Sequence, residues 1–183
     1  APHNIAISKD TSYYRVLDLS SGISAAFNGN ALTSVFHQSI GGYHAAKLSI
    51  YQDLIENQLY NFPRCMPTIN MLNTKYILSP DSTGQLAPQT NPGALGNAWL
   101  VSSVQVVPTA DEALNGIGKI DPRNVALVEK KDASFVPAAS FKTDGTINLT
   151  SYKPNHLTYI SDAKNPSFAI FSEIYYRGNK DWK

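Results

Sequence analysis

The chain has 183 residues, of which 43% are hydrophobic and 16% are charged, and its formal net charge is +1. The apolar fraction permits a real core, whereas the charged fraction lies below the roughly 25% that is usual for soluble domains. We therefore expect a polar but weakly charged surface. The sequence has no basic run that would neutralise a row of phosphates, which argues against a nucleic-acid-binding protein.

The apolar stretches are all shorter than the roughly 18 residues that a membrane-spanning helix needs. We therefore expect that this chain folds outside the lipid bilayer. Because the chain does not begin with Met, we interpret it as a piece of a longer protein. The single cysteine, Cys65, cannot form an intrachain disulfide and is expected to be a small, semi-buried apolar residue.

The first third of the chain predicts one strand and one helix. Residues 13–19 are rich in β-branched, aromatic and aliphatic side chains, which predicts a strand. The glycines and asparagines of residues 20–34 predict a loop. In residues 45–59 apolar side chains recur at three- and four-residue steps, the pattern of a helix with one buried face. Prolines in residues 61–67 end this helix.

The middle of the chain predicts short mixed elements. They are a helical turn at residues 69–72 and strands at residues 75–78, 98–107 and 125–129, the second of them bent at Ser102 and Ser103. Residues 79–97 contain three prolines and three glycines and are expected to form a long exposed loop. Thr109 begins a further helix, because its hydroxyl can cap the first turn while Glu112 reaches back.

The last part of the chain predicts strands alone. Residues 147–152, 157–161 and 168–176 form three short strands separated by turns, which indicates an antiparallel, sandwich-like module. The predicted fold class is therefore α+β. A mixed strand and helix domain at residues 1–135 is followed by the start of an antiparallel β-sandwich at residues 136–183, truncated at the C-terminus.

One segment concentrates aromatic, imidazole, amide and glycine residues. The residues that we expect to contact a substrate are His37, Gln38, Gly41, Gly42, Tyr43, His44 and Lys47. Paired glycines let the backbone approach a ligand closely, aromatic rings stack on the C–H faces of sugars, and the polar groups supply hydrogen bonds. The alternative is a tight loop packed under the helix, with Phe36 and Tyr43 in the core. Trp99 is either buried or faces a ligand.

No pattern in the sequence predicts a catalytic residue, a metal site or a cofactor. His37 and His44 lie seven residues apart across the glycine pair, whereas helical metal ligands use a spacing of three or four. No nucleophile elbow and no phosphate-binding loop occurs. Asp162 and Glu173 are isolated carboxylates, so no glycosidase pair can be read from their spacing.

Six segments of the sequence resemble the C-terminal extracytoplasmic region of the YfhO family of bacterial membrane proteins, in its Bacteroidetes form. They occur in the family's order over most of the chain. The segments are FHQSIGGYHAAKLSIYQDLIE at 36–56, NMLNTKYIL at 70–78, NPGALGNAWLV at 91–101, DPRNVALVEK at 121–130, LTSYKPNHLTYIS at 149–161 and FAIFSEIYY at 168–176.

The resemblance implies a polytopic membrane protein that is similar to glycosyltransferases using lipid-linked sugars. In such proteins the catalytic carboxylate is expected between early membrane helices, so this chain would be an accessory domain and not itself catalytic. Its partners would be the transmembrane portion of the same polypeptide and a glycan or lipid-linked sugar. The whole protein would be located in the cell membrane, with this soluble part on the periplasmic or extracellular side.

Two alternatives remain at this point. The aromatic and asparagine-rich composition also suits a free-standing carbohydrate-binding module. A purely structural interaction domain is the other alternative. The family's sandwich continues past the position of Trp182, so a truncated sheet edge could pair between chains and give a non-biological dimer.

Overall fold

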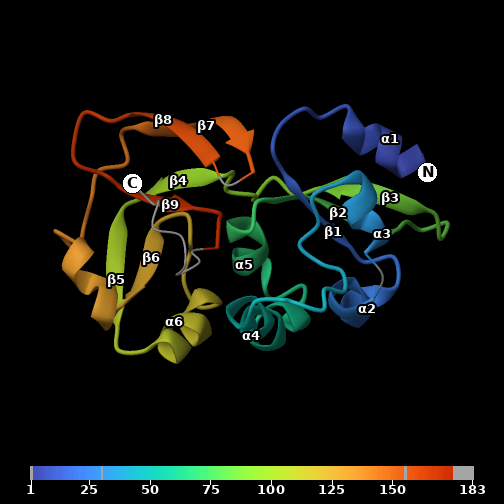
Figure 1. The fold of residues 1–183 in the computed structure, drawn as a ribbon, viewed down its shortest axis with the longest axis horizontal. Helices are drawn as coiled ribbons and strands as arrows, with labels where there is room; N and C mark the ends of the chain where they lie inside the picture. Colours follow the sequence, from blue (N-terminus) through green and yellow to red (C-terminus); the bar gives the residue numbers. More distant parts are fainter. Residues whose placement is uncertain (1, 30, 155, 175–183) are drawn as a thin grey trace.

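The structure, a computed structural model, describes residues 2–29, 31–154 and 156–174 and consists of two lobes side by side (Figure 1). The N-terminal lobe comprises the described residues up to 97, and the C-terminal lobe comprises the described residues from 98 onward. The α+β class predicted from the sequence is confirmed, because helices and several small sheets alternate in both lobes.

The N-terminal lobe is built around a three-stranded sheet. Its elements are α1 (Pro2–Ser8), β1 (Arg15–Asp18), α2 (Gly22–Asn28), α3 (Leu32–Phe36), α4 (Ser49–Asn57), the 3-10 helix η1 (Leu59–Asn61), α5 (Met66–Met71), β2 (Thr74–Pro80) and β3 (Leu86–Thr90). In the order β1-β2-β3, β1 and β2 are parallel and β3 is antiparallel. Ser39 adds a further parallel bridge on the other side of β1, opposite Val16.

The two faces of this sheet bury different clusters, because successive side chains of a strand point to opposite faces. Leu17 packs with the main core, which α2, α4 and α5 complete through Phe27, Ile55 and Ile69. The neighbouring Val16 packs on the other face with Ile7 of α1. Full burial of each such side chain stabilises the fold by about 1.5–3 kcal/mol.

The C-terminal lobe contains three two-stranded pairs. Its elements are β4 (Ala98–Val101), β5 (Ser103–Val107), α6 (Ala110–Ile117), β6 (Val125–Glu129), the 3-10 helix η2 (Lys130–Phe135), β7 (Thr146–Lys153), β8 (His156–Asp162) and β9 (Phe168–Phe171). β5 and β6 are parallel and joined through α6, whereas the β4–β9 and β7–β8 pairs are antiparallel. Val101, Val104 and Ala126 form the buried centre of this lobe.

The capping prediction at the start of α6 is confirmed. The Thr109 side chain accepts a hydrogen bond from the Glu112 backbone amide at 3.2 Å, which satisfies one of the donors that the first turn leaves unpaired. The strand predicted at residues 125–129 is also confirmed, as are strands within residues 13–19 and 75–78.

Two predictions for the secondary structure are wrong, and a third, the bent strand at residues 98–107, is confirmed only in part. Residues 20–34 contain α2 and part of α3, because tertiary contacts of Phe27 outweigh the loop chemistry of the glycines and asparagines. The expected long loop at residues 79–97 includes β3, which pairs with β2. The predicted strand at residues 98–107 divides at Ser102, and its halves β4 and β5 join different sheets.

The region predicted as a partial sandwich forms the β7–β8 pair and strand β9. β9 pairs with β4, which lies before the predicted domain boundary at residue 135. Phe141 and Val136 likewise pack against the core that Val101 and Val104 build. The last positions of the predicted strand at 168–176, Tyr175 and Tyr176, lie outside the described residues. A sandwich stays a prediction, because the described strands of this lobe form pairs.

Among the described residues, no helix is long and apolar enough to cross a bilayer.

Gly41 lies where the segment after Ser39 crosses α2. A Cβ atom at Gly41 would stand 2.1 Å from the Ala26 carbonyl oxygen, which is backbone and cannot move aside. We expect Gly41→Ala to lower the free energy of unfolding by about 2 kcal/mol or more, measured by urea denaturation. Gly84→Ala is the control. A Cβ atom at Gly84 would meet open space, and only the φ of +79° opposes a side chain. Gly84→Ala should therefore lower the free energy of unfolding by only about 1 kcal/mol.

Cys65 lies in the main core, and its exposed fraction is 2%. Burial raises the pKa of its thiol to about 11. Because the thiolate is the reactive form, we expect a disulfide reagent at pH 8 to modify the native chain at least about tenfold more slowly than the urea-unfolded chain. Equal rates would show that Cys65 is accessible in the native state.

Candidate functional site

A cavity of about 530 Å³ lies between the two lobes, and we call it the interlobe cavity. The N-terminal lobe contributes Arg15, Ser39, Ile40, Gly41, Gly42, His44, Lys47, Tyr51, Met71 and Leu72 to its lining, and the C-terminal lobe contributes Trp99 and residues 170–174. Its size falls in the range of about 300–1,000 Å³ that small-ligand sites occupy, and such sites favour the boundary between structural units.

Aromatic rings of the C-terminal lobe form one wall of the cavity. The Trp99 indole N–H donates to the Pro122 carbonyl at 2.8 Å, which fixes the half-buried ring between the core of its lobe and the cavity. Phe171 of β9 contacts the Tyr159 ring edge to face, with centroids 4.9 Å apart. Both rings are therefore held in place before any ligand binds, which lowers the entropic cost of binding.

An ion pair with supporting hydrogen bonds joins the lobes at this cavity. The Arg15 guanidinium donates from one nitrogen to Glu173 Oε1 at 2.9 Å and from another to Ser172 Oγ at 2.7 Å. It also donates to the Leu72 carbonyl at 3.1 Å, while the Ser172 hydroxyl donates to the Met71 carbonyl at 2.6 Å. The side chains of Arg15 and Glu173 are each only 18% exposed. This network therefore ties β1 to the segment after β9.

Lys47, in the loop before α4, and Tyr51 of α4 line the opposite wall, and each makes a hydrogen bond that fixes it. The Lys47 ammonium donates to the Phe27 carbonyl at 3.0 Å, in the last turn of α2, where a cation is favoured by the unpaired carbonyls. The Tyr51 hydroxyl donates to the Ile40 carbonyl. Burial raises the pKa of Tyr51, against a smaller lowering influence of Arg15, so the phenol stays neutral and remains a donor.

The structure brings four of the seven predicted substrate-contacting residues to the interlobe cavity. Gly41, Gly42, His44 and Lys47 line it. The exposed His44 ring accepts at Nδ1 from the Ala46 amide at 3.2 Å, which orients the imidazole. A substrate-binding role for these residues stays a prediction.

The other three predicted residues do not line the cavity. The His37 ring is buried, and its Nε2 lies 3.2 Å from Asn4 Oδ1 of α1. Gln38 is exposed, and its carbonyl accepts from the Val16 amide at 2.8 Å. Tyr43 is 66% exposed, so it is not the core residue that the alternative interpretation expected.

Gly41 and Gly42 allow their backbone segment to pack closely against α2. Gly41 lets its segment cross Ala26 of α2, as described above, and Gly42 has a φ of +98°, a conformation that side chains with a Cβ rarely adopt. The Gly42 amide also donates to the Ala26 carbonyl at 2.6 Å. The close approach that the sequence indicated is therefore made to a helix of the same chain.

Arg15, Tyr51 and Glu173 were missed as site residues. Arg15 stands in a largely apolar strand, where a charged side chain is a signal that reasoning from the sequence alone had available. Tyr51 looked like a core position of a helix, and Glu173 looked isolated, because its partner lies 158 residues away along the chain.

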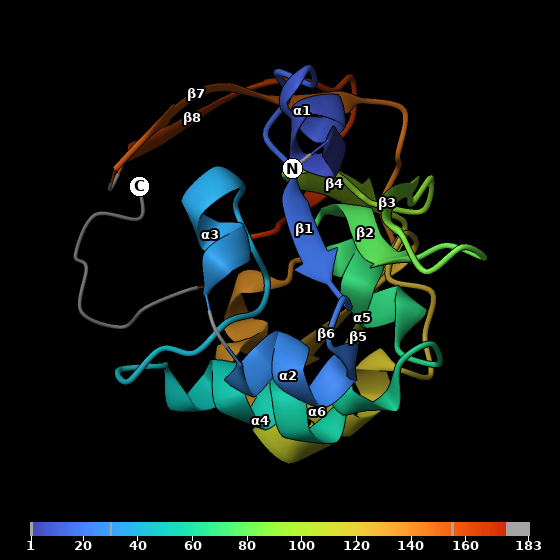
Figure 2. The same cartoon turned by 90° about the vertical axis from the view of Figure 1, so that its right-hand side faces the viewer.

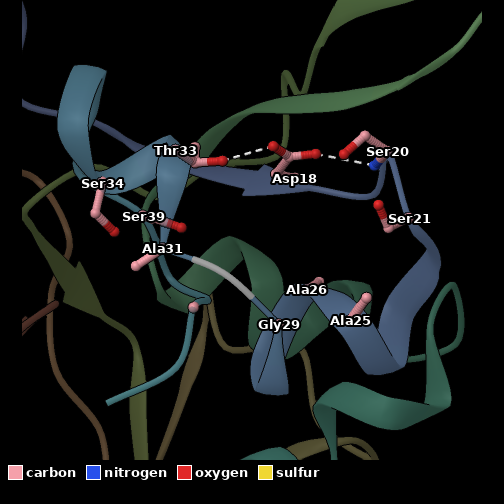
Figure 3. A pocket seen from close by; sticks show the side chains of 11 residues that line it. Asp18, Ser20, Ser21, Ala25, Ala26, Gly29, Ala31, Thr33, Ser34 and Ser39 are labelled. Atoms are coloured by element: carbon pink, nitrogen blue, oxygen red, sulfur yellow. Dashed lines mark hydrogen bonds between the residues drawn. The ribbon is translucent and has the colours of Figure 1, made fainter.

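A second, smaller pocket of about 80 Å³ lies at the end of β1, and we call it the β1-end pocket (Figure 3). It shares Ser39 and Gly42 with the interlobe cavity. Within residues 2–29, 31–154 and 156–174, no three histidine, cysteine, aspartate or glutamate residues stand close enough together to hold a metal ion.

No protein-family description, curated protein or solved structure matches this chain. The resemblance to the YfhO family therefore stays an expectation that depends on the six sequence segments.

Removing one partner of the Arg15–Glu173 pair is expected to cost more stability than removing one partner of an exposed pair. Arg15→Met leaves the half-buried Glu173 carboxylate without its cation, so we expect the free energy of unfolding to fall by about 2 kcal/mol in urea denaturation. Lys131→Met is the matched control. This substitution breaks a pair with Glu129 in which the lysine is 54% exposed. It should lower the free energy of unfolding by less than about 1 kcal/mol. Equal losses would contradict a special role for Arg15.

Proposed function

We propose that this chain is an accessory extracytoplasmic domain of a polytopic membrane protein that resembles glycosyltransferases using lipid-linked sugars. In this proposal the domain helps to position a glycan or envelope polymer at the interlobe cavity. The observation that carries the proposal is the composition of that cavity. Four of the six segments that resemble the YfhO family meet there: 36–56 through His44 and Lys47, 70–78 through Met71 and Leu72, 91–101 through Trp99, and 168–176 through Phe171.

The lining of the cavity suits a polyhydroxylated ligand. Trp99 and Phe171 offer ring faces, against which the C–H faces of sugars pack. Lys47 donates to one protein carbonyl, and an ammonium has three donors, so it can also donate to ligand hydroxyls. Sugar recognition of this kind combines apolar contact area with a few fixed polar groups.

The proposal assigns a positioning role and not proton transfer to this domain. Among the residues that the structure describes, Glu173 is the one carboxylate that lines the interlobe cavity, and its Oε1 accepts from Arg15 at 2.9 Å. Hydrolysis of a glycosidic bond commonly uses two carboxylates on either side of the bond. We therefore place the chemical step in the transmembrane portion of the same polypeptide, on the periplasmic or extracellular side.

The proposal also includes the sandwich. The β7–β8 pair lies beside β4, and the Tyr159 ring of β8 contacts Phe171 of β9. Two antiparallel pairs in contact through aromatic side chains are a suitable start for two facing sheets. A chain extended beyond residue 183 is expected to add strands to these pairs.

A free-standing carbohydrate-binding module is the second candidate, and the same aromatic wall favours it. The two candidates differ in where function is lost. For an accessory domain, substitutions at the cavity lower sugar transfer by the full-length membrane protein, while the isolated chain binds glycans weakly. For a module, the isolated chain binds a defined glycan strongly.

His44→Ala tests the cavity in the full-length protein. The imidazole lines the cavity, and its hydrogen bond to the Ala46 amide lies within its own loop, so the fold should persist. We expect sugar transfer to fall about three- to tenfold, the effect of one lost hydrogen bond, as measured by incorporation of labelled sugar into membranes.

Tyr43→Ala is the matched control, because Tyr43 is an exposed neighbour that does not line the cavity. It should leave transfer unchanged. Transfer by the isolated chain alone, or equal losses from His44→Ala and Tyr43→Ala, would contradict the proposal.

A further inference from the structure

The β1-end pocket lies where parallel strands end. The Val16 amide donates to the Gln38 carbonyl at 2.8 Å, and the Ile40 amide donates to the Val16 carbonyl at 3.1 Å, so the Ser39 segment runs parallel to β1. β2 is parallel to β1 on its other side. Asp18, the last residue of β1, and Ser39 both line the pocket. Open α/β sheets bind ligands outside the carboxyl ends of their parallel strands.

Hydroxyl groups dominate the polar lining of this pocket. They belong to Ser20, Ser21, Thr33, Ser34 and Ser39, and the remaining walls are Ala25, Ala26, Gly29, Ala31 and Gly42. Figure 3 shows the Asp18 carboxylate between Thr33 of α3 and Ser20, with Ser34 and Ser39 on the side of Thr33. Among the described residues, Asp18 is the only charged member of the lining.

Asp18 is fixed from two sides. The Thr33 hydroxyl donates to Oδ2 at 2.5 Å, and the Ser20 amide donates to Oδ1 at 2.9 Å. Ser39 Oγ accepts from the Gly41 amide at 3.0 Å, which leaves its O–H to donate. The pocket therefore combines a carboxylate, which accepts from ligand hydroxyls, with serine hydroxyls, which donate and accept.

We propose that the β1-end pocket is a binding site for a neutral polyol, such as glycerol or the hydroxymethyl end of a sugar. The Asp18 carboxylate disfavours anions, and a lining rich in hydroxyls disfavours apolar ligands. The volume of about 80 Å³ corresponds to roughly two or three water molecules, so a whole sugar ring does not fit. This site borders the interlobe cavity at Ser39 and Gly42, but the polyol assignment does not depend on the function proposed for that cavity.

The test is a titration of the ¹⁵N-labelled chain with glycerol, followed by amide NMR. We expect saturable shifts at Ser34, Ser39 and Gly42 and none at Phe135, which lies in η2 of the other lobe. Ser34→Ala should weaken binding about two- to tenfold, the effect of one hydrogen bond. Ser34 is exposed, so this variant should keep the spectrum of the folded chain.

Ser24→Ala is the matched control, because Ser24 is an exposed serine of α2 outside the pocket. It should leave the affinity unchanged. The absence of saturable shifts would overturn the proposal, as would equal weakening by the two serine variants. Tighter binding of glycerol 3-phosphate than of glycerol would show an anion site instead, and competition by sodium chloride would show a cation site; either result overturns the polyol assignment.

Discussion

The contact of Arg15 with the segment after β9 is the constraint on which the relation of the two lobes depends. A guanidinium presents its donors in a rigid planar fork, so it can bind a carboxylate, a hydroxyl and a carbonyl at once in one geometry. Here the three acceptors are Glu173, Ser172 and Leu72. A partly buried ion pair often contributes little net stability, because desolvation opposes attraction. Its larger effect in this chain is to fix the position of residues 172–173 against β1, and with it the shape of the interlobe cavity.

A second constraint is the passage of residues 39–42 between β1 and α2. Ser39 pairs with β1, and the Gly42 amide donates to a carbonyl of α2. The segment thus forms a thin wall that borders the interlobe cavity and also the β1-end pocket. Glycine at position 41 keeps that wall thin, because a side chain would collide with the helix backbone. Figure 2 shows α2 and α4 on one side of the N-terminal lobe and α1 on the opposite side.

The two cavities differ in chemistry in a way that suits different parts of a carbohydrate. The interlobe cavity offers aromatic faces and cationic groups, which favour the ring of a sugar. The β1-end pocket offers one carboxylate and several hydroxyls within a much smaller volume, which favour a terminal diol or hydroxymethyl group. Both depend on side chains that the fold holds in place through hydrogen bonds within the protein. The proposed accessory role requires this property, because a positioning domain must be rigid before its substrate arrives.

The sequence by itself determined the elements whose signals are local. The composition of the strand at β1, the cap at Thr109, the period of α4 and the strand of residues 125–129 all depend on residues within a few positions, so they could be predicted. It also singled out seven residues between His37 and Lys47 as substrate contacts, four of which line the interlobe cavity.

Only the tertiary structure decided which side of that segment faces the cavity. It turned His37 toward Asn4 of α1 and left Tyr43 at the surface. It also decided the assignment of β4 and β5 to different sheets and the pairing of Arg15 with Glu173. Those outcomes depend on contacts between residues as far as 158 positions apart, and no local pattern encodes such a pairing.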